Sequence, residues 1–182
     1  MTSTKVEETN EILTGLVATV RSPEIPESAD VYGWLIGSWD LDVYHYITNV
    51  REHSIKGEVH FKRILEGRAV QDVWIMPRRS DRTGEPETAC NSYGTTLRVW
   101  DASIQAWRVT WINAVSGNRD ELIGRRVGME IVQLGTHANG TPIRWTFTDI
   151  SSDSFRWTGD TLEPDGKTWK LEAEFHAIRT GP

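Results

Sequence analysis

The stretch Ile143-Arg144-Trp145-Thr146-Phe147-Thr148 decides the fold class, because large apolar residues alternate with polar residues along it. Alternation with a period of two is typical of a β-strand that buries one face and exposes the other. The same pattern returns in Phe155-Arg156-Trp157-Thr158 and again from Trp169 to Ala177. The short polar segments between these runs, at residues 151–154 and 164–166, indicate tight hairpins. The stretch therefore predicts three consecutive antiparallel strands with one aromatic face.

Further strand-like segments follow one another at short spacing in the preceding part of the chain. They are residues 39–47, 54–65, 69–76, 91–101, 106–114, 121–126 and 129–134. Asn139-Gly140, just before the opening stretch, is typical of a two-residue type I′ hairpin turn. About ten short strands joined by turns indicate a sandwich or a barrel, and consecutive hairpins favour the barrel. We therefore expect an all-β fold, an antiparallel up-and-down barrel of about ten strands.

The N-terminal residues follow a helical pattern instead. Leu13, Leu16, Val17 and Val20 share one face of a helix predicted for residues 4–20. Such a helix must bury its apolar face, so we expect it against the barrel, across a barrel mouth or against a second copy of the chain. An exposed apolar stripe would indicate an interaction module or a homodimer. The expected division of the chain is a helix and linker at residues 1–30 and a barrel at residues 31–182.

Composition and charge argue against several classes of partner. The chain has 182 residues, a net charge of −6 and a pI of about 5.4, without the dense Lys and Arg cluster of a nucleic-acid surface. Its apolar runs are far shorter than the roughly 18 residues of a membrane span. Cys90 is the single cysteine, which leaves no intrachain disulfide or thiolate metal site. The acidic N-terminus is unlike a signal peptide, so we expect a cytoplasmic protein without nucleic-acid or membrane partners.

Several motifs resemble a known superfamily. Gly33-Trp34-Leu35-Ile36-Gly37-Ser38-Trp39-Asp40 resembles the LxGxW opening of calycin barrels, which include lipocalins, fatty-acid-binding proteins and nitrobindins. The blocks at residues 66–74, 93–101, 107–111, 153–157 and 165–169 are similar to bacterial lipocalin-like proteins of the DUF1579 family. The resemblance covers residues 33–179. It implies a calycin-like barrel and assigns no particular chemistry.

Alternation within each strand assigns a set of side chains to the barrel interior. They are Trp39, Leu41, Val43, His45, Ile55, Val59, Phe61, Val70, Asp72, Trp74, Met76, Thr96, Arg98, Trp100, Trp107, Val109, Trp111, Asn113, Trp145, Phe147, Phe155, Trp157, Trp169, Leu171 and Phe175. A barrel of about ten strands is wider than the roughly eight-stranded size that side chains can just fill, so a ligand cavity is expected. The alternative is that the tryptophans fill the barrel as ordinary core.

The polar members of this set and the tryptophans are the candidate site residues. The candidate ligand-binding residues are Trp39, Trp74, Arg98, Trp100, Trp107, Trp111, Asn113, Trp145 and Trp157. A buried charge requires a partner, and Asp72 on the strand before Arg98 is the expected one. If the protein is an enzyme, Asp72 or His45 would be the catalytic residue that transfers a proton.

The function expected from this interior is binding of a small hydrophobic molecule, of aromatic, polyketide or terpenoid type, without a cofactor. The alternative is a cyclase or isomerase on the same barrel, in which the tryptophans order a flexible substrate. The five histidines lack metal-ligand spacing, so no metal site is expected. Nitrobindin-like barrels hold haem through a His near the end of the chain, but alternation places His176 on the solvent face.

Overall fold

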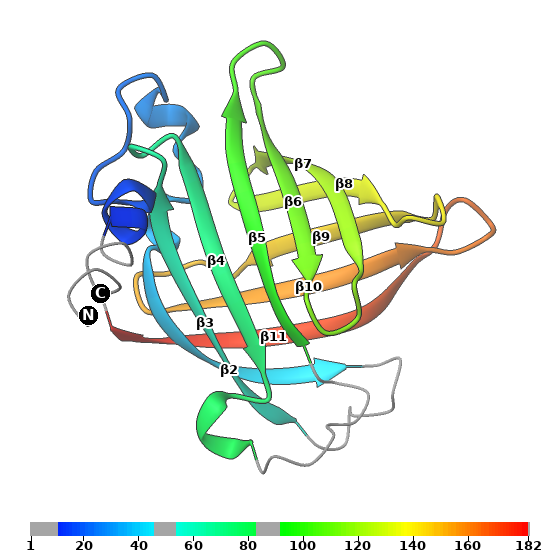
Figure 1. Ribbon diagram of the computed structural model, residues 1–182. Helices are drawn as coiled ribbons and strands as arrows, with labels where there is room; N and C mark the ends of the chain where they lie inside the picture. Colours follow the sequence, from blue (N-terminus) through cyan, green and yellow to red (C-terminus); the bar gives the residue numbers. More distant parts are fainter. Residues whose placement is uncertain (1–10, 46–53, 83–91, 182) are drawn as a thin grey trace.

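The computed structural model describes residues 11–45, 54–82 and 92–181, and within them the chain forms a closed antiparallel β-barrel (Figure 1). Ten described strands follow one another around the barrel in chain order, and β11 pairs with β2 to close it. They are β2 (Gly37–His45), β3 (Ile55–Ile64), β4 (Ala69–Met76), β5 (Ser92–Asp101), β6 (Ala106–Asn113), β7 (Arg119–Val127), β8 (Glu130–Thr136), β9 (Pro142–Thr148), β10 (Ser154–Leu162) and β11 (Trp169–Gly181). The predicted up-and-down barrel is confirmed, and its architecture is compatible with a calycin-like fold.

The alternation of the sequence sets the inner face of most strands. In β2, Trp39, Leu41 and Val43 are buried inside the barrel, whereas Asp40 between them is exposed. Directly paired residues of neighbouring strands share a face, so a residue that points into the barrel has a partner that also points into it. Trp39, for example, pairs with the buried Val59 of β3. One alternating pattern per strand is therefore enough to place most of the core.

A β-bulge in β11 overturns the predicted inward position of two residues. The pairing of β10 with β11 shifts between Gly159 and Asp160, where Glu172 is the extra residue. Beyond the bulge, Leu171 pairs with Asp160 on the outer face, and Trp169 lies below the outer Arg144 guanidinium, 4.5 Å from it. The bulge changes the parity of the strand, so the prediction that Leu171 and Trp169 face inward was wrong.

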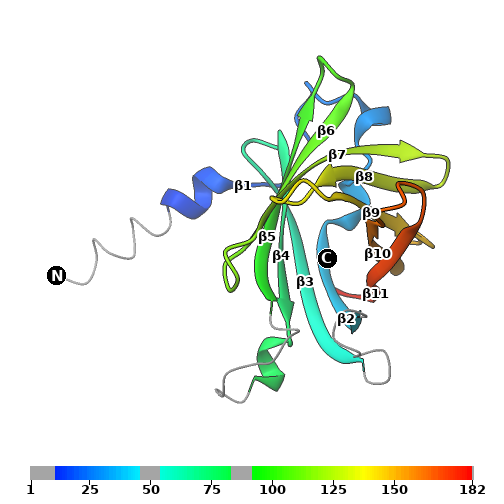
Figure 2. The same ribbon diagram turned by 90° about the vertical axis from the view of Figure 1, so that its right-hand side faces the viewer.

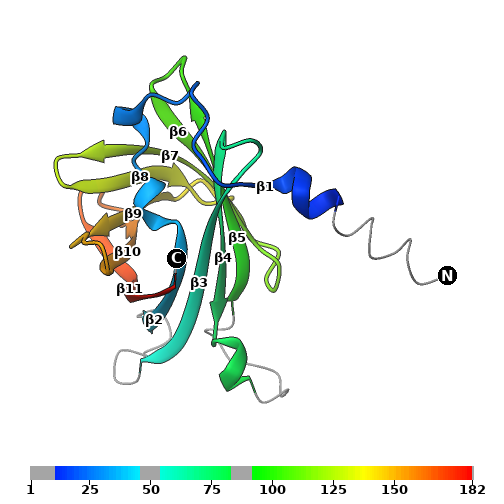
Figure 3. The same cartoon turned by 90° about the vertical axis from the view of Figure 1, so that its left-hand side faces the viewer.

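The N-terminal helix ends four residues earlier than predicted, at residue 16. Residues 11–16 are helical, and the helix ends there because the next residues, β1 (Val17–Ala18), pair with the end of β3. The first ten residues lie outside the described residues. The helix points away from the barrel and does not lie on it (Figure 2, Figure 3). Of the predicted apolar stripe, Leu13 is 53% exposed on this helix, whereas Val17 and Val20, which are 47% and 70% exposed, lie beyond its end. A role of these residues in association stays a prediction.

The segment at residues 22–36, which we call the plug, closes one end of the barrel. It contains two 3-10 turns, η1 (Glu27–Ala29) and η2 (Gly33–Leu35), and its Tyr32 is fully buried inside the barrel. The Tyr32 hydroxyl donates to Oε1 of Gln133 on β8 at 3.1 Å, and Trp107 Nε1 on β6 donates to the Ala29 carbonyl at 2.8 Å. The sequence pattern indicated only an irregular linker over most of this segment. Four of its side chains, those of Ile25, Val31, Tyr32 and Leu35, instead belong to the barrel core.

The hairpin between β8 and β9 has a turn of a different type from the predicted one. Gly140 has a φ of 84°, and its N–H donates to the His137 carbonyl. The φ of Asn139, however, is not positive. A type I′ turn would need positive φ at both central residues. The observed geometry is that of a four-residue turn in which only the last residue, Gly140, is left-handed.

Gly140→Ala should therefore destabilise the fold by about 1 kcal/mol, since a residue with a Cβ is strained in the left-handed region. Gly15→Ala serves as the control for crowding and should not lower stability, because Ala is favoured over Gly in the helix that contains residue 15. A Cβ at either glycine meets no atom within 4 Å, but only Gly140 has positive φ. Thermal or urea unfolding of the two variants separates backbone strain from crowding. Equal midpoints for both variants and the wild type would refute the turn assignment.

Candidate functional site

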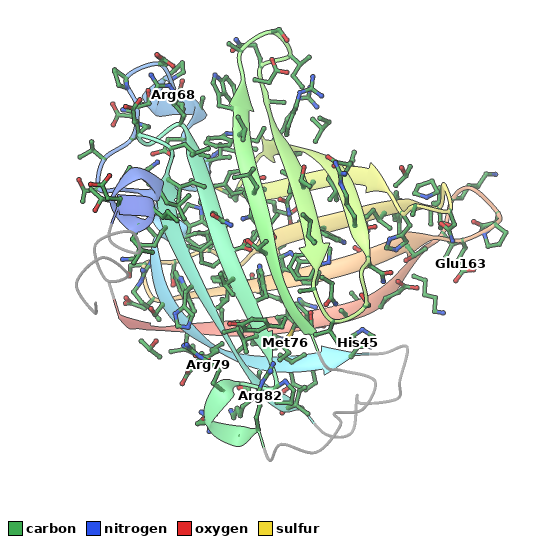
Figure 4. The ribbon with its side chains drawn as sticks, in the orientation of Figure 1. His45, Arg68, Met76, Arg79, Arg82 and Glu163 are labelled. Carbon is green, nitrogen blue, oxygen red and sulfur yellow. The ribbon has the colours of Figure 1, made fainter. Side chains whose placement is uncertain are left out.

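A cavity of about 400 Å³ lies inside the barrel, at the end opposite the plug. His45 and Met76 lie at this end, whereas Arg68 lies at the plug end (Figure 4). Exposed Ser116 and Asn118 also contribute to the wall, so the cavity reaches solvent here. The full lining consists of Val43, His45, Trp74, Met76, Ser92, Thr96, Arg98, Trp111, Asn113, Ser116, Asn118, Trp145, Trp157, Ala173 and Phe175.

Five aromatic side chains form a continuous wall around most of this cavity. Trp111 contacts Trp145 edge to face, with ring centroids 6.4 Å apart, and Trp145 lies 5.7 Å from Trp157. Trp157 stacks on Phe175 at 4.6 Å and an angle of 10°, and Phe175 lies 5.5 Å from Trp74. The wall runs over β6, β9, β10, β11 and β4. Between β4 and β6, the two ends of this wall, lies β5, which contributes polar side chains to the lining.

One of those polar side chains, Arg98, forms the floor of the cavity. Arg98 of β5 is 1% exposed, and its Nη1 lies 2.5 Å from Oδ2 of the equally buried Asp72 on β4. The second carboxylate oxygen of Asp72 accepts the backbone N–H of Thr96 at 2.6 Å. The carboxylate is thus held at both oxygens, and Arg98 keeps further donors. Inside a barrel, each residue of such a pair needs the other, because either charge alone would be costly to bury.

Aromatic rings surround the Arg98 guanidinium on the plug side. Its Cζ lies 5.1 Å from the Tyr32 ring centroid, 5.6 Å from that of Phe61 and 5.9 Å from that of Phe147. Burial raises the pKa of Tyr32 well above its ordinary value, although the nearby Arg98 charge acts in the opposite direction. The Tyr32 hydroxyl therefore stays protonated. Arg98 marks the boundary between a packed aromatic core below it and the open cavity above it.

His45 and Asn113 lie near the cavity mouth. Burial lowers the pKa of His45 below its ordinary value of 6.5, and the Glu172 charge opposes this shift. His45 is therefore expected to be neutral at pH 7. The Asn113 side chain is already engaged, since its Nδ2 donates to Ser92 and its Oδ1 accepts the N–H of Val115. Asn113 thus shapes the rim of the cavity.

The structure brings together most, but not all, of the predicted site residues. Trp74, Arg98, Trp111, Asn113, Trp145, Trp157 and His45 line the cavity. Trp39 and Trp107 do not, because their indole N–H groups donate to the Leu35 and Ala29 carbonyls within the core at the plug end. Trp100 borders a separate, smaller hollow of about 240 Å³. Asp72 lies behind Arg98 and is not part of the lining.

Two residues near the floor were missed by sequence reasoning. Tyr32 lies in the plug, which has no strand or helix periodicity that could have revealed an inward side chain. Gln133 is fully buried on β8 and pairs directly with Trp145. Its position two residues after Ile131 was a usable signal, because Ile131 is also buried inside the barrel.

The remaining sequence expectations concern metal, haem and membrane. Among the described residues, no three His, Cys, Asp or Glu side chains are grouped as a metal site requires, and Cys90 lies outside them. His176 is on the outer face as predicted; its side chain is 51% exposed and lies 2.5 Å from the Glu174 carboxylate. Of the helices in the described part of the chain, none combines the length and apolar character of a membrane span.

Fold and site together define a closed ten-stranded β-barrel with an aromatic cavity at one end. Comparison of the sequence with profiles of known protein families and with curated proteins finds no match. The similarity to the DUF1579 family therefore stays a prediction.

Removing one partner of the floor ion pair should strongly destabilise the protein. Arg98→Met and Asp72→Asn should each cost about 3–5 kcal/mol, because each leaves one polar partner uncompensated inside the barrel. The double variant should cost less than the sum of the two single variants. Urea unfolding of all four proteins gives this cycle. Additive effects would show that the two side chains do not interact.

His45 should titrate with a pKa below 6.5, because burial favours its neutral form. The unfolded chain then takes up this proton more readily than the folded protein, so His45 lowers stability as the pH falls through and below 6.5. The stability advantage of His45→Gln over the wild type should consequently grow as the pH falls below 6.5. NMR titration of the His45 ring measures the pKa directly. A value above 6.5 would mean that the Glu172 charge outweighs burial.

Proposed function

We propose that this protein binds a small, apolar molecule with an aromatic or polycyclic body inside the barrel. The observation that carries this proposal is the wall of five aromatic side chains around a space of about 400 Å³ that the protein leaves unfilled. Protein interiors are normally packed without such voids. Four of the nine tryptophans line this space, whereas Trp39 and Trp107 are fully buried at the plug end.

The size of the cavity limits the ligand. An apolar cavity of roughly 150 Å³ holds one benzene molecule. A volume of about 400 Å³ therefore suits a molecule of two or three fused rings with a short substituent. Aromatic rings prefer offset-stacked or edge-to-face contacts, and the wall offers both. Polyketide-like or terpenoid-like ring systems have this shape and polarity.

A second candidate, an enzyme that cyclises or isomerises such a molecule, is favoured by one observation. His45 lines the cavity and its pKa is lowered, so a neutral imidazole faces the bound molecule at pH 7 and can accept a proton. Asp72 is less suited to that role because both of its oxygens are engaged. A His45→Gln variant that binds a ligand normally but no longer converts it would identify an enzyme.

Binding is tested by titrating the protein with a naphthalene-based probe and following tryptophan fluorescence. Two different probes should quench the fluorescence and compete for one site. Trp111→Ala should weaken binding about tenfold or more, since the variant loses an aromatic contact worth at least ~1.4 kcal/mol together with its buried area.

Trp100→Ala is the matched control for this experiment. Trp100 is half-buried like Trp111 and lies on the neighbouring strand, but it does not line the cavity. Its variant should bind the probes with unchanged affinity. If no probe binds, or if both variants lose binding equally, the cavity is not the binding site.

A further inference from the structure

Among the described residues of the cavity lining, Arg98 is the only side chain that carries a full charge at neutral pH, because His45 is neutral there. Its charge is already compensated by Asp72, which lies 2.5 Å away and is shielded from water. The floor of the cavity therefore presents the hydrogen-bond donors of a guanidinium, but the Arg98–Asp72 pair as a whole has no net charge. This combination restricts the kind of molecule that can rest on it.

Within the part of the chain that the structure describes, two hydrogen-bond donors near the floor have no acceptor. Arg98 uses Nη1 for Asp72, and its buried Nε is without a partner. Gln133 accepts the Tyr32 hydroxyl through Oε1, and its buried Nε2 is likewise without a partner. Buried donors are almost always satisfied in folded proteins. Nε itself is covered, but Arg98 belongs to the cavity lining, so a rotation of its guanidinium would bring the free donor to an acceptor on a bound molecule.

The missing group is an oxygen acceptor, and the charge balance decides its type. A carboxylate at this point would add an uncompensated negative charge to an apolar cavity, which is strongly unfavourable. A carbonyl oxygen accepts the same hydrogen bond without adding charge. A hydrocarbon of equal shape would enter the cavity but leave the Arg98 donor unsatisfied.

We propose that the ligand is a neutral aromatic or polycyclic ketone, quinone or lactone whose carbonyl oxygen enters first and accepts a hydrogen bond from Nε of Arg98. This inference rests on the proposed function and adds the chemical class and the orientation of the ligand. The ring system then lies between Trp74, Trp157 and Trp145, with its far end toward the mouth at His45.

Three probes of nearly equal shape test this inference on the wild-type protein. They are 2-acetylnaphthalene, its isostere 2-isopropenylnaphthalene, in which a methylene replaces the carbonyl oxygen, and 2-naphthoate. Dissociation constants come from fluorescence quenching at pH 7.5. We expect the ketone to bind at least about tenfold more tightly than the isostere, as a hydrogen bond from a charged donor warrants. The carboxylate should bind most weakly.

The outcomes separate this inference from the proposed function. Equal affinity for the ketone and the isostere would leave the binding function intact but overturn the role of Arg98. Tightest binding of 2-naphthoate would overturn the neutral class in favour of an anion site. If none of the three probes binds, the proposed binding function itself is wrong.

A spectroscopic measurement locates the carbonyl at Arg98. The ¹³C resonance of carbonyl-labelled 2-acetylnaphthalene should move downfield on binding, beyond its position in cyclohexane. Arg98→Lys retains the positive charge opposite Asp72 but removes Nε, so it should reduce both this shift and the preference for the ketone. If Arg98→Lys does not fold, the wild-type shift alone decides, and a value like that in cyclohexane would overturn the inference.

Discussion

Arg98 and Asp72 form an ion pair on neighbouring strands near the middle of the barrel, almost completely shielded from water. The geometry around the pair explains how two charges are tolerated there. Thr96 donates to the second oxygen of the carboxylate, and aromatic rings pack around the guanidinium on the plug side. Each charge depends on the other, because an isolated buried charge would be far more costly than the pair. The pair therefore separates the plug half of the barrel interior from the open half at a fixed position along the barrel axis.

The two halves on either side of this pair differ in packing. Toward the plug, Tyr32, Trp39 and Trp107 fill the barrel and satisfy their polar groups with protein acceptors. Toward the open end, the wall of Trp74, Trp111, Trp145, Trp157 and Phe175 surrounds empty volume. The plug makes this asymmetry possible, since it supplies the side chains that a ten-stranded barrel needs to fill one end. The expectation of a cavity and the alternative of a tryptophan-filled core each describe one half of the molecule.

Periodicity was sufficient to predict the barrel, its strands and the inward position of Asp72 and Arg98. It failed where a single residue changes the parity of a strand, as Glu172 does in β11, because a bulge leaves no clear mark on an alternating pattern. It also failed for Tyr32, whose position depends on tertiary packing of a segment without regular structure. Alternation assigns a side chain to the interior but not to a height along the barrel axis. For that reason Trp39 and Trp107 could not be distinguished from the cavity tryptophans.

The central claim is that some tryptophans face a ligand cavity and others belong to a packed core. It is tested most directly by the ¹⁵N–¹H indole spectrum of the protein, with resonances assigned by single Trp→Phe variants, before and after addition of 2-acetylnaphthalene. We predict that the indole resonances of Trp74, Trp111, Trp145 and Trp157 shift, whereas those of Trp39 and Trp107, which donate to backbone carbonyls, stay in place. Shifts confined to Trp39 and Trp107, or no shift at any tryptophan, would contradict the account.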